Sequence, residues 1–132
     1  KRDNLPSVTC WGRGTVSREF MHVDDLAEGI IFSLKNWFPA EKNAPKDDWG
    51  NPLYHLNIGT GIDISIKDLA SKIADITKFK GKILWDLSKP EGTPKKLLDI
   101  SRIKKMGWEA KIDLDTGIEQ TISSLKNKKF FP

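Results

Sequence analysis

Residues 11–27, WGRGTVSREFMHVDDLA, combine a glycine turn, a stretch of extended chain and the start of a helix. The two glycines near its start predict a turn, because glycine adopts backbone conformations that other residues avoid. Residues 18–23 favour an extended chain. The carboxylates of Asp24 and Asp25 then suit the positive end of a helix dipole. The segment therefore predicts a strand that passes directly into a helix.

The helix that begins at Asp24 has apolar residues at the spacing of one helical face, namely Leu26, Ile30, Ile31 and Leu34. This spacing places the four side chains on one apolar face of the helix. The helix should end near Trp37, because Pro39 follows. On the other side of the opening segment, residues 8–11 are β-branched and aromatic and predict a short strand.

Strand-like and helix-like segments alternate in the rest of the chain. Ser65, followed three residues later by Asp68, predicts a capped helix start. Apolar residues at helical spacing mark the inner faces of two helices, with Ile66, Leu69, Ile73 and Ile76 in one and Leu114, Ile118, Ile122 and Leu125 in the other. The expected elements are strands at 54–58 and 82–86 and helices from 65 to about 79, from 101 to 106 and from about 113 to 128. This alternation predicts an α/β fold with about four helices and short strands.

A long irregular segment at residues 39–52 separates the first helix from the clearest strand. Three prolines and mixed charges predict a loop there. Loops of this length in compact domains are either insertions or functional flaps. The segment contains no obvious chemistry, so we favour an inserted loop.

The composition is that of one ordinary domain, with 132 residues, 38% hydrophobic residues and a net charge of +4. It excludes a disordered tail and a disulfide scaffold. We expect no membrane segment, because no stretch of 18 apolar residues exists. Acidic residues interleave with the basic ones, so a phosphorylated small ligand suits the charge better than a nucleic acid. With a single cysteine, Cys10, and no leader-like start, we expect a cytoplasmic protein.

Residues able to perform catalysis are few. His22 and His55 lie far apart, neither has a cysteine or histidine at metal-ligand spacing, and Cys10 has no motif of an activated nucleophile. The sequence therefore predicts neither a metal site nor a catalytic centre.

The second glycine turn, Gly59-Thr60-Gly61, has the context of a dinucleotide-binding loop, between a predicted strand and a predicted helix. The third glycine of that motif is missing, because Ile64 occupies its position. We favour a structural turn, and cofactor binding remains the alternative.

Charged residues gather around Arg18 and in the loop 89–96, KPEGTPKK. An arginine fork matches the geometry of a diphosphate, although an ion pair with a nearby aspartate is the alternative. In the loop, prolines restrict the backbone, Glu91 can accept hydrogen bonds from sugar hydroxyls, and the lysines can balance phosphate charge. A solvated surface loop explains the same residues equally well.

The motifs, taken together, resemble a known family. Residues 11–27 are similar to the carboxyl-terminal half of extended short-chain dehydrogenases that act on nucleotide sugars. Three further segments narrow the resemblance to the GDP-L-fucose synthase family: residues 57–61 (NIGTG), 89–99 (KPEGTPKKLLD) and 101–108 (SRIKKMGW). The resemblance covers nearly the whole chain.

This resemblance implies that residues 1–132 are the carboxyl-terminal substrate-binding domain of a longer enzyme. The cofactor-binding Rossmann half would be missing, and 39–52 would be the family's variable loop. Such an enzyme converts GDP-4-keto-6-deoxy-mannose to GDP-L-fucose with NADPH, binds no metal, and would be a homodimer. The family's Tyr-x-x-x-Lys pair is absent here, because the only tyrosine is Tyr54 and Ile58 stands four residues later. We therefore expect the chain alone to have no turnover, and to self-associate through surfaces that the missing half would cover.

The resemblance also assigns four substrate-binding residues. It implies that Arg18 contacts the diphosphate, that Trp11 lines the substrate pocket and that Lys96 lies near the nucleotide. Glu91 stands where the family commonly has an aspartate that contacts the ribose. Two alternatives remain: an epimerase or reductase for UDP or dTDP sugars, and a non-catalytic binding module.

Overall fold

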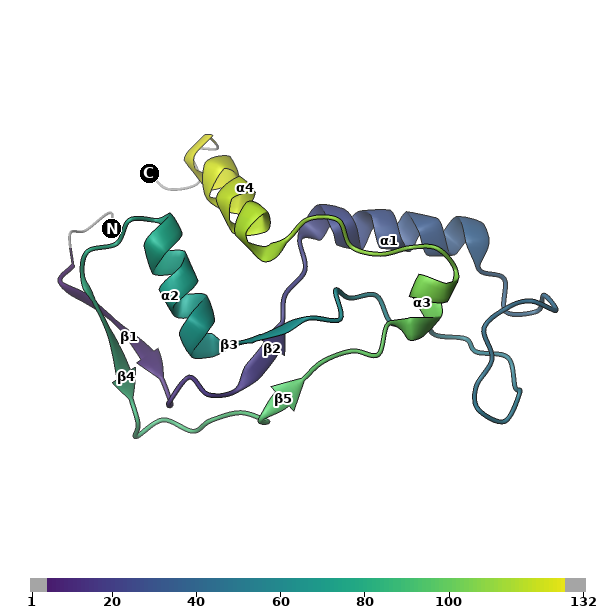
Figure 1. Ribbon diagram of the computed structural model, residues 1–132, viewed down its shortest axis with the longest axis horizontal. Coiled ribbons are helices and arrows are strands. Elements are labelled where there is room, and N and C mark those ends of the chain that lie inside the picture. Colours follow the sequence, from purple (N-terminus) through teal and green to yellow (C-terminus); the bar gives the residue numbers. More distant parts are fainter. Residues whose placement is uncertain (1–4, 128–132) are drawn as a thin grey trace.

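The computed structural model describes residues 5–127, which form an elongated α/β unit (Figure 1). The described part contains four helices and five short strands. The sequence predicted this combination of about four helices with short strands. In chain order they are β1 (Ser7–Trp11), β2 (Ser17–Glu19), α1 (Val23–Asn36), β3 (Asp63–Ser65), α2 (Ile66–Ile76), β4 (Lys82–Asp86), β5 (Lys95–Lys96), α3 (Ser101–Lys105) and α4 (Leu114–Asn127).

The strands form two small sheets. In one, β1 and β4 pair in parallel over five residues each, so that Trp11 and Asp86 lie side by side at the carboxyl ends. In the other, β2 is the central strand, antiparallel to β3 and parallel to β5. This second sheet lies in the middle of the molecule and joins its two ends (Figure 1).

Local capping chemistry explains where two helices begin. The His22 side chain accepts a hydrogen bond from the Asp24 N–H at the start of α1, and the Ser65 hydroxyl accepts one from the Asp68 N–H at the start of α2. The predicted starts are therefore confirmed to within one residue. α2 ends earlier than predicted, because Lys78 adopts a left-handed conformation (φ 53°). For α4, the predicted end at residue 128 lies outside the described residues.

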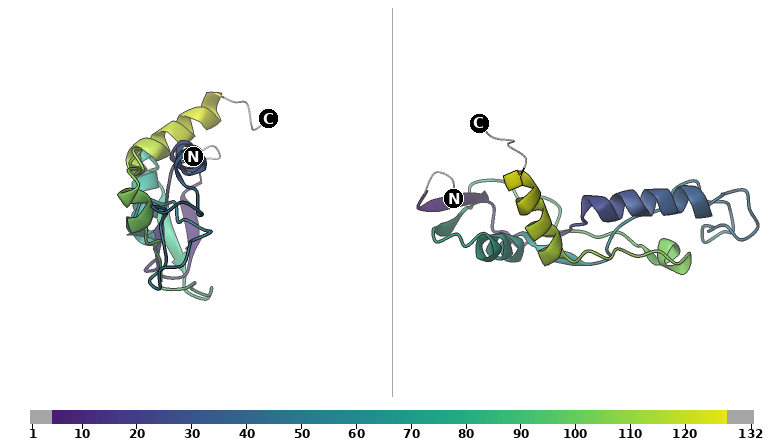
Figure 2. Two further views of the ribbon diagram at one scale, coloured as in Figure 1. Left: turned by 90° about the vertical axis from the view of Figure 1, so that its right-hand side faces the viewer. Right: turned by 90° about the horizontal axis from the view of Figure 1, so that it is seen from above.

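The buried core is small and lies near α3. Its centre is Ile103, which is fully buried and packs with Ile100 and Trp108. Seen from above, α1 lies along one long side of the molecule, and α2 and α3 lie along the other (Figure 2). At Gly29 a Cβ atom would lie 2.8 Å from Ile58 Cγ2 and 2.9 Å from the Trp108 ring, so this glycine lets α1 approach the core closely.

The four apolar side chains predicted to share one face of α1 lie on the exposed side of the helix, in agreement with the expectation of an apolar surface that the missing half would cover. We call Val23, Leu26, Ile30, Ile31 and Leu34 the outer face of α1; their exposed fractions range from 39% to 73%. The side that is buried contains Asp25 and Gly29. Helical periodicity identifies a face that favours burial, but the described residues cover the opposite one.

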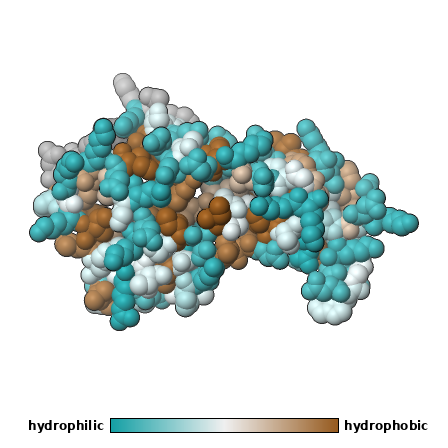
Figure 3. Space-filling model, in the orientation of Figure 1, coloured by the Kyte–Doolittle hydropathy of each residue, from teal (hydrophilic) through white to brown (hydrophobic). Residues whose placement is uncertain are grey.

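The prediction that the apolar faces of α2 and α4 point inward is confirmed in part. They lie toward one another across an apolar groove of about 400 Å³, whose walls include Leu69, Ile118 and Ile122. Ile73 and Leu125 remain 40% and 47% exposed. On one broad face of the molecule, apolar side chains gather in the middle and hydrophilic ones surround them (Figure 3).

The strand predicted at residues 54–58 does not form, because no other described strand pairs with it. A strand needs a neighbour for its backbone hydrogen bonds, and residue pattern alone does not supply one. Conversely, β3 and β5 were not predicted, because they are short and mostly polar. Residues 39–52 are irregular, with one isolated bridge between Lys46 and Pro52.

Two findings concern the described residues only. No helix between residues 5 and 127 is long and apolar enough to cross a membrane. The same residues contain no group of three or more histidine, cysteine or acidic side chains arranged to hold a metal ion.

Candidate nucleotide-binding site

The predicted site residues come from four neighbouring segments: the end of β1, strand β2, the loop between β4 and β5, and strand β5 itself. The loop after β4 lies beside the turn after β1, since the Gly12 N–H donates to the Asp86 carbonyl at 2.9 Å. The loop then reaches β2, where the Ser17 N–H donates to the Pro94 carbonyl at 2.8 Å. Carboxyl ends of parallel strands commonly position ligand-binding groups.

Trp11 is the last residue of β1, and its side chain is largely exposed (68%). The Lys89 ammonium lies 5.6 Å from the centroid of its indole ring, within the range of a cation–π contact. An exposed tryptophan with a cation on one face offers a flat surface for packing against a ligand. Trp11 therefore lies beside the predicted loop.

Arg18 and Lys96 lie side by side, because they are register partners in the parallel pair of β2 and β5. Neighbouring residues of two paired strands point to the same face of the sheet. The Arg18 Nη1 donates to the Ser17 carbonyl at 2.6 Å, and within the described part neither cation forms an ion pair with a carboxylate. Two adjacent, unpaired cations repel each other, and an anion between them would relieve the repulsion.

Glu91 forms its hydrogen bond with the turn after β1. Its Oε1 accepts a hydrogen bond from the backbone N–H of Arg13 at 2.6 Å, in the turn after β1. The structure thus groups the four predicted residues in two pairs. Arg18 and Lys96 lie together on the central sheet, and Trp11 and Glu91 lie around the end of β1.

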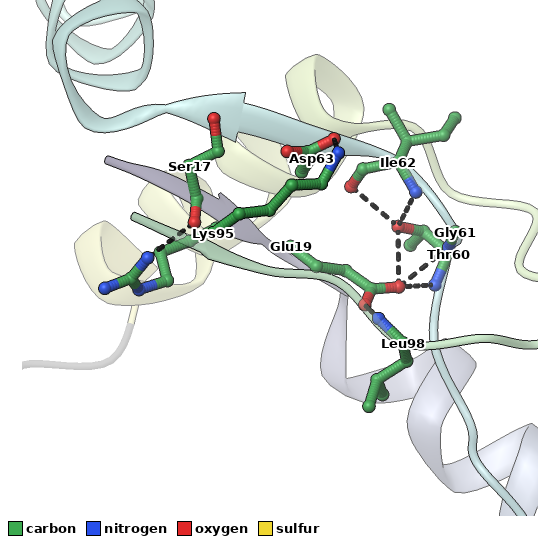
Figure 4. A network of polar contacts seen from close by, with 9 residues as sticks. Ser17, Glu19, Thr60, Gly61, Ile62, Asp63, Lys95 and Leu98 are labelled. Carbon is green, nitrogen blue, oxygen red and sulfur yellow. Dashed lines mark hydrogen bonds and ion pairs between the residues drawn. The ribbon is translucent and has the colours of Figure 1, made fainter. Parts of the chain in front are cut away.

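Glu19 has a central structural role that sequence reasoning missed. Its Oε1 accepts the N–H groups of Thr60 and Gly61 at 2.5 and 2.7 Å, and its Oε2 accepts the N–H of Leu98 at 3.0 Å (Figure 4). Burial raises the pKa of Glu19, but the N–H groups of Leu98, Gly61 and Thr60 lower it more, so the pKa lies below its ordinary value. Glu19 fixes the strand that carries Arg18 against the segment that follows Lys96. An acid next to Arg18 was the only signal for it in the sequence.

The turn at residues 59–61 has a structural role, which is the interpretation that the sequence favoured over cofactor binding. Its N–H groups donate to the Glu19 carboxylate, which therefore occupies the place where a phosphate would bind. A Cβ atom at Gly61 would lie 2.8 Å from Ile100 Cδ1, so the core also fills the other side of this turn. These residues do not fit a cofactor phosphate, and no chemistry of NADP is derived from them.

The other candidate catalytic side chains do not form a site. His22 caps α1 through its Nδ1, which accepts the Asp24 N–H at 3.3 Å. His55 lies exposed in the unpaired segment 54–58, and Cys10 is a half-buried free thiol in β1. Among the described residues, these three side chains lie in separate parts of the molecule and do not form a common site.

The chain is similar in sequence and in fold to known proteins. Residues 1–50 match the NAD dependent epimerase/dehydratase family. The chain is 40% identical over 121 residues to the probable GDP-L-fucose synthase 1 of Oryza sativa subsp. japonica, covering 92% of this chain and 33% of the relative. It is 42% identical over 120 residues to the GDP-L-fucose synthase of Escherichia coli K12, covering 89% of this chain and 36% of the relative.

A solved structure of similar fold is MlghC, a GDP-mannoheptose C4 reductase from Campylobacter jejuni with NADP bound. It superposes with a TM-score of 0.74 at 38% identity, over 91% of this chain and 35% of that protein. The chain thus spans about a third of the length of the relatives it matches. Over that third, the sequence of the chain is similar to those of GDP-L-fucose synthases.

Proposed function

We propose that this chain binds the nucleoside diphosphate part of a GDP-sugar, as the substrate-binding portion of a GDP-L-fucose synthase. The observation that carries the proposal is the adjacent pair Arg18 and Lys96, two unpaired cations on the central sheet. The relatives' names add the ligand class, since they are synthases and reductases of GDP-sugars.

In this proposal Arg18 contacts the diphosphate through its guanidinium fork, and Lys96 balances the remaining phosphate charge. Trp11 packs against the ligand with the ring face that Lys89 leaves open. The Glu91 Oε2, which has no partner among the described residues, accepts a ribose hydroxyl. Glu19 holds the cations in place from behind the sheet and does not touch the ligand.

For the whole enzyme we propose conversion of GDP-4-keto-6-deoxy-mannose to GDP-L-fucose in the cytoplasm by a homodimer. There NADPH supplies the hydride that reduces C4 of the sugar. Epimerisation at C3 and C5 needs acid–base groups that titrate near neutral pH, and the family's Tyr-x-x-x-Lys pair is not in this chain. The chain alone should therefore leave NADPH unoxidised in the presence of that substrate; oxidation would contradict its assignment as a binding portion only.

The proposal is tested by titrating the 132-residue chain with GDP and with UDP while following thermal unfolding. Binding to the native state raises the midpoint, so GDP should stabilise the chain more than UDP. R18A and K96A should each weaken GDP binding by about tenfold, the value of one charged hydrogen bond. K126A removes a cation from the last turn of α4 and is the matched control, which should bind like the unchanged chain. Equal stabilisation by UDP would favour the UDP- or dTDP-sugar alternative, and stabilisation by neither would favour a non-catalytic module.

A further inference from the structure

The loop of residues 89–94 lies on the turn of residues 12–14, and Glu91 is the residue that joins them. Its Oε1 receives the N–H of Arg13 at 2.6 Å, a short distance typical of a hydrogen bond to a charged acceptor. The two residues are 78 positions apart in the chain, so this contact connects segments that the sequence alone does not relate.

The turn has the shape needed to receive this side chain. A Cβ atom at Gly12 would lie 2.9 Å from Glu91 Cγ and 3.3 Å from its Oε1, and Gly12 has a φ of +74°. Any other residue at position 12 would therefore be strained and would also push the Glu91 side chain away. The aliphatic part of Glu91 lies in the space that the glycine leaves.

The same loop also borders Arg18. A Cβ atom at Gly92 would lie 2.9 Å from the Arg18 Nη2, so the loop backbone passes directly beside the guanidinium. Two residues further on, the Pro94 carbonyl accepts the N–H of Ser17. The position of the loop thus determines the surroundings of the arginine proposed to bind the diphosphate.

We propose that Glu91 is a positioning residue, which fastens the 89–94 loop to the turn after β1 and so forms the wall of the site before a ligand arrives. The length of the side chain is essential to this role. An aspartate on the same backbone would end about one carbon–carbon bond, roughly 1.5 Å, short of the Arg13 N–H. The ligand-binding consequence rests on the proposed function, whereas the fastening itself does not.

The role is tested by separating side-chain length from charge in the 132-residue chain. E91Q keeps the length and an acceptor oxygen but loses the charge, whereas E91D keeps the charge and loses the length. E91A removes both. The first measurement is the hydrogen-exchange rate of the Arg13 amide by NMR, and the second is GDP affinity by calorimetry. E109Q, which affects only a surface ion pair with Lys104, is the control.

We expect Arg13 exchange in E91Q to stay within about threefold of the unchanged chain, and to rise about tenfold or more in E91D and E91A. GDP affinity should fall in E91D and E91A, and a fall in E91Q without faster Arg13 exchange would report the separate loss of the Oε2 acceptor for the ribose. Any other ranking of Arg13 exchange, including no change in all three variants, would overturn the proposal. If no variant and not even the unchanged chain binds GDP, the proposed function fails, while the exchange ranking still decides the role of Glu91.

Discussion

The central sheet and the outer face of α1 differ in how their chemical groups are satisfied. At the central sheet, one carboxylate, that of Glu19, receives three backbone N–H groups from two distant segments. On the outer face of α1, large apolar side chains remain exposed, with Leu34 at 73%. The Glu19 carboxylate finds these partners within the described residues. The apolar side chains of the helix face leave water only when another surface covers them.

The two regions therefore depend on two different kinds of stabilising interaction. Polar networks must be satisfied internally, because an unpaired buried group costs free energy in any context. An apolar face contributes only when a partner removes it from water. Each prediction below tests one side of this contrast.

Replacing Glu19 should have the largest effect. E19A leaves the N–H groups of Thr60, Gly61 and Leu98 without their acceptor, and we expect the free energy of unfolding to fall by about 3 kcal/mol. Urea denaturation of the variant and of E109Q, the exposed control, measures the difference. A loss of less than about 1 kcal/mol would show that the central sheet does not depend on this carboxylate.

The buried side of α1 should be next in sensitivity. In G29A the new methyl group would lie under 3 Å from Ile58 and Trp108, and overpacking of this kind costs about 2 kcal/mol. The change also improves helix propensity, which offsets about 1 kcal/mol of this cost. A net loss of about 1 kcal/mol is therefore expected in urea denaturation. A more stable G29A would mean that α1 does not approach the core closely.

Acidification should reproduce the loss of E19A in part. Because the native pKa of Glu19 lies below its ordinary value, the unfolded chain takes up a proton first as the pH falls. Stability from this group is complete above the ordinary glutamate range, near pH 4.3, and declines below it. E19Q should flatten this part of the pH profile in urea denaturation at several pH values. An unchanged profile in E19Q would assign the acid sensitivity to other carboxyl groups.

Charged residues on the outer face of α1 should have the smallest effect on stability. The double variant I30E/L34E should change the free energy of unfolding by less than about 0.5 kcal/mol, because both side chains are already exposed. The unchanged chain should self-associate through this face, and the variant should be monomeric in light scattering. The matched variant K35E alters charge on the same helix without removing apolar area and should still associate. A monomeric unchanged chain would contradict the need for a cover.

Local chemistry made much of the fold predictable. The turn at Gly12 and the starts of α1 and α2 depend on neighbouring residues only, through glycine conformations and capping side chains. The strand β4 lies at the predicted residues 82–86, although it also needs β1 as its partner. β3 and β5 were not predictable in this way, since segments of three and two mostly polar residues become strands only because β2 lies between them.

The candidate site was predictable in its residue types and not in its geometry. Arg18, Lys96 and the 89–94 loop stood out by charge and by prolines, and the fold brings them together around β2. The contact of Glu91 with Arg13 could not be foreseen, because any acceptor in the chain could have taken that N–H.

The sequence by itself determined the local elements, the α/β class and the family resemblance, because these depend on spacing and on short motifs. Only the tertiary structure decided which side of α1 is covered, that residues 54–58 have no strand partner, and that Glu19 occupies the turn at 59–61. Glu19 is 41 residues from Thr60 and 79 residues from Leu98. Contacts over such separations depend on how the whole chain closes on itself, which local periodicity does not encode.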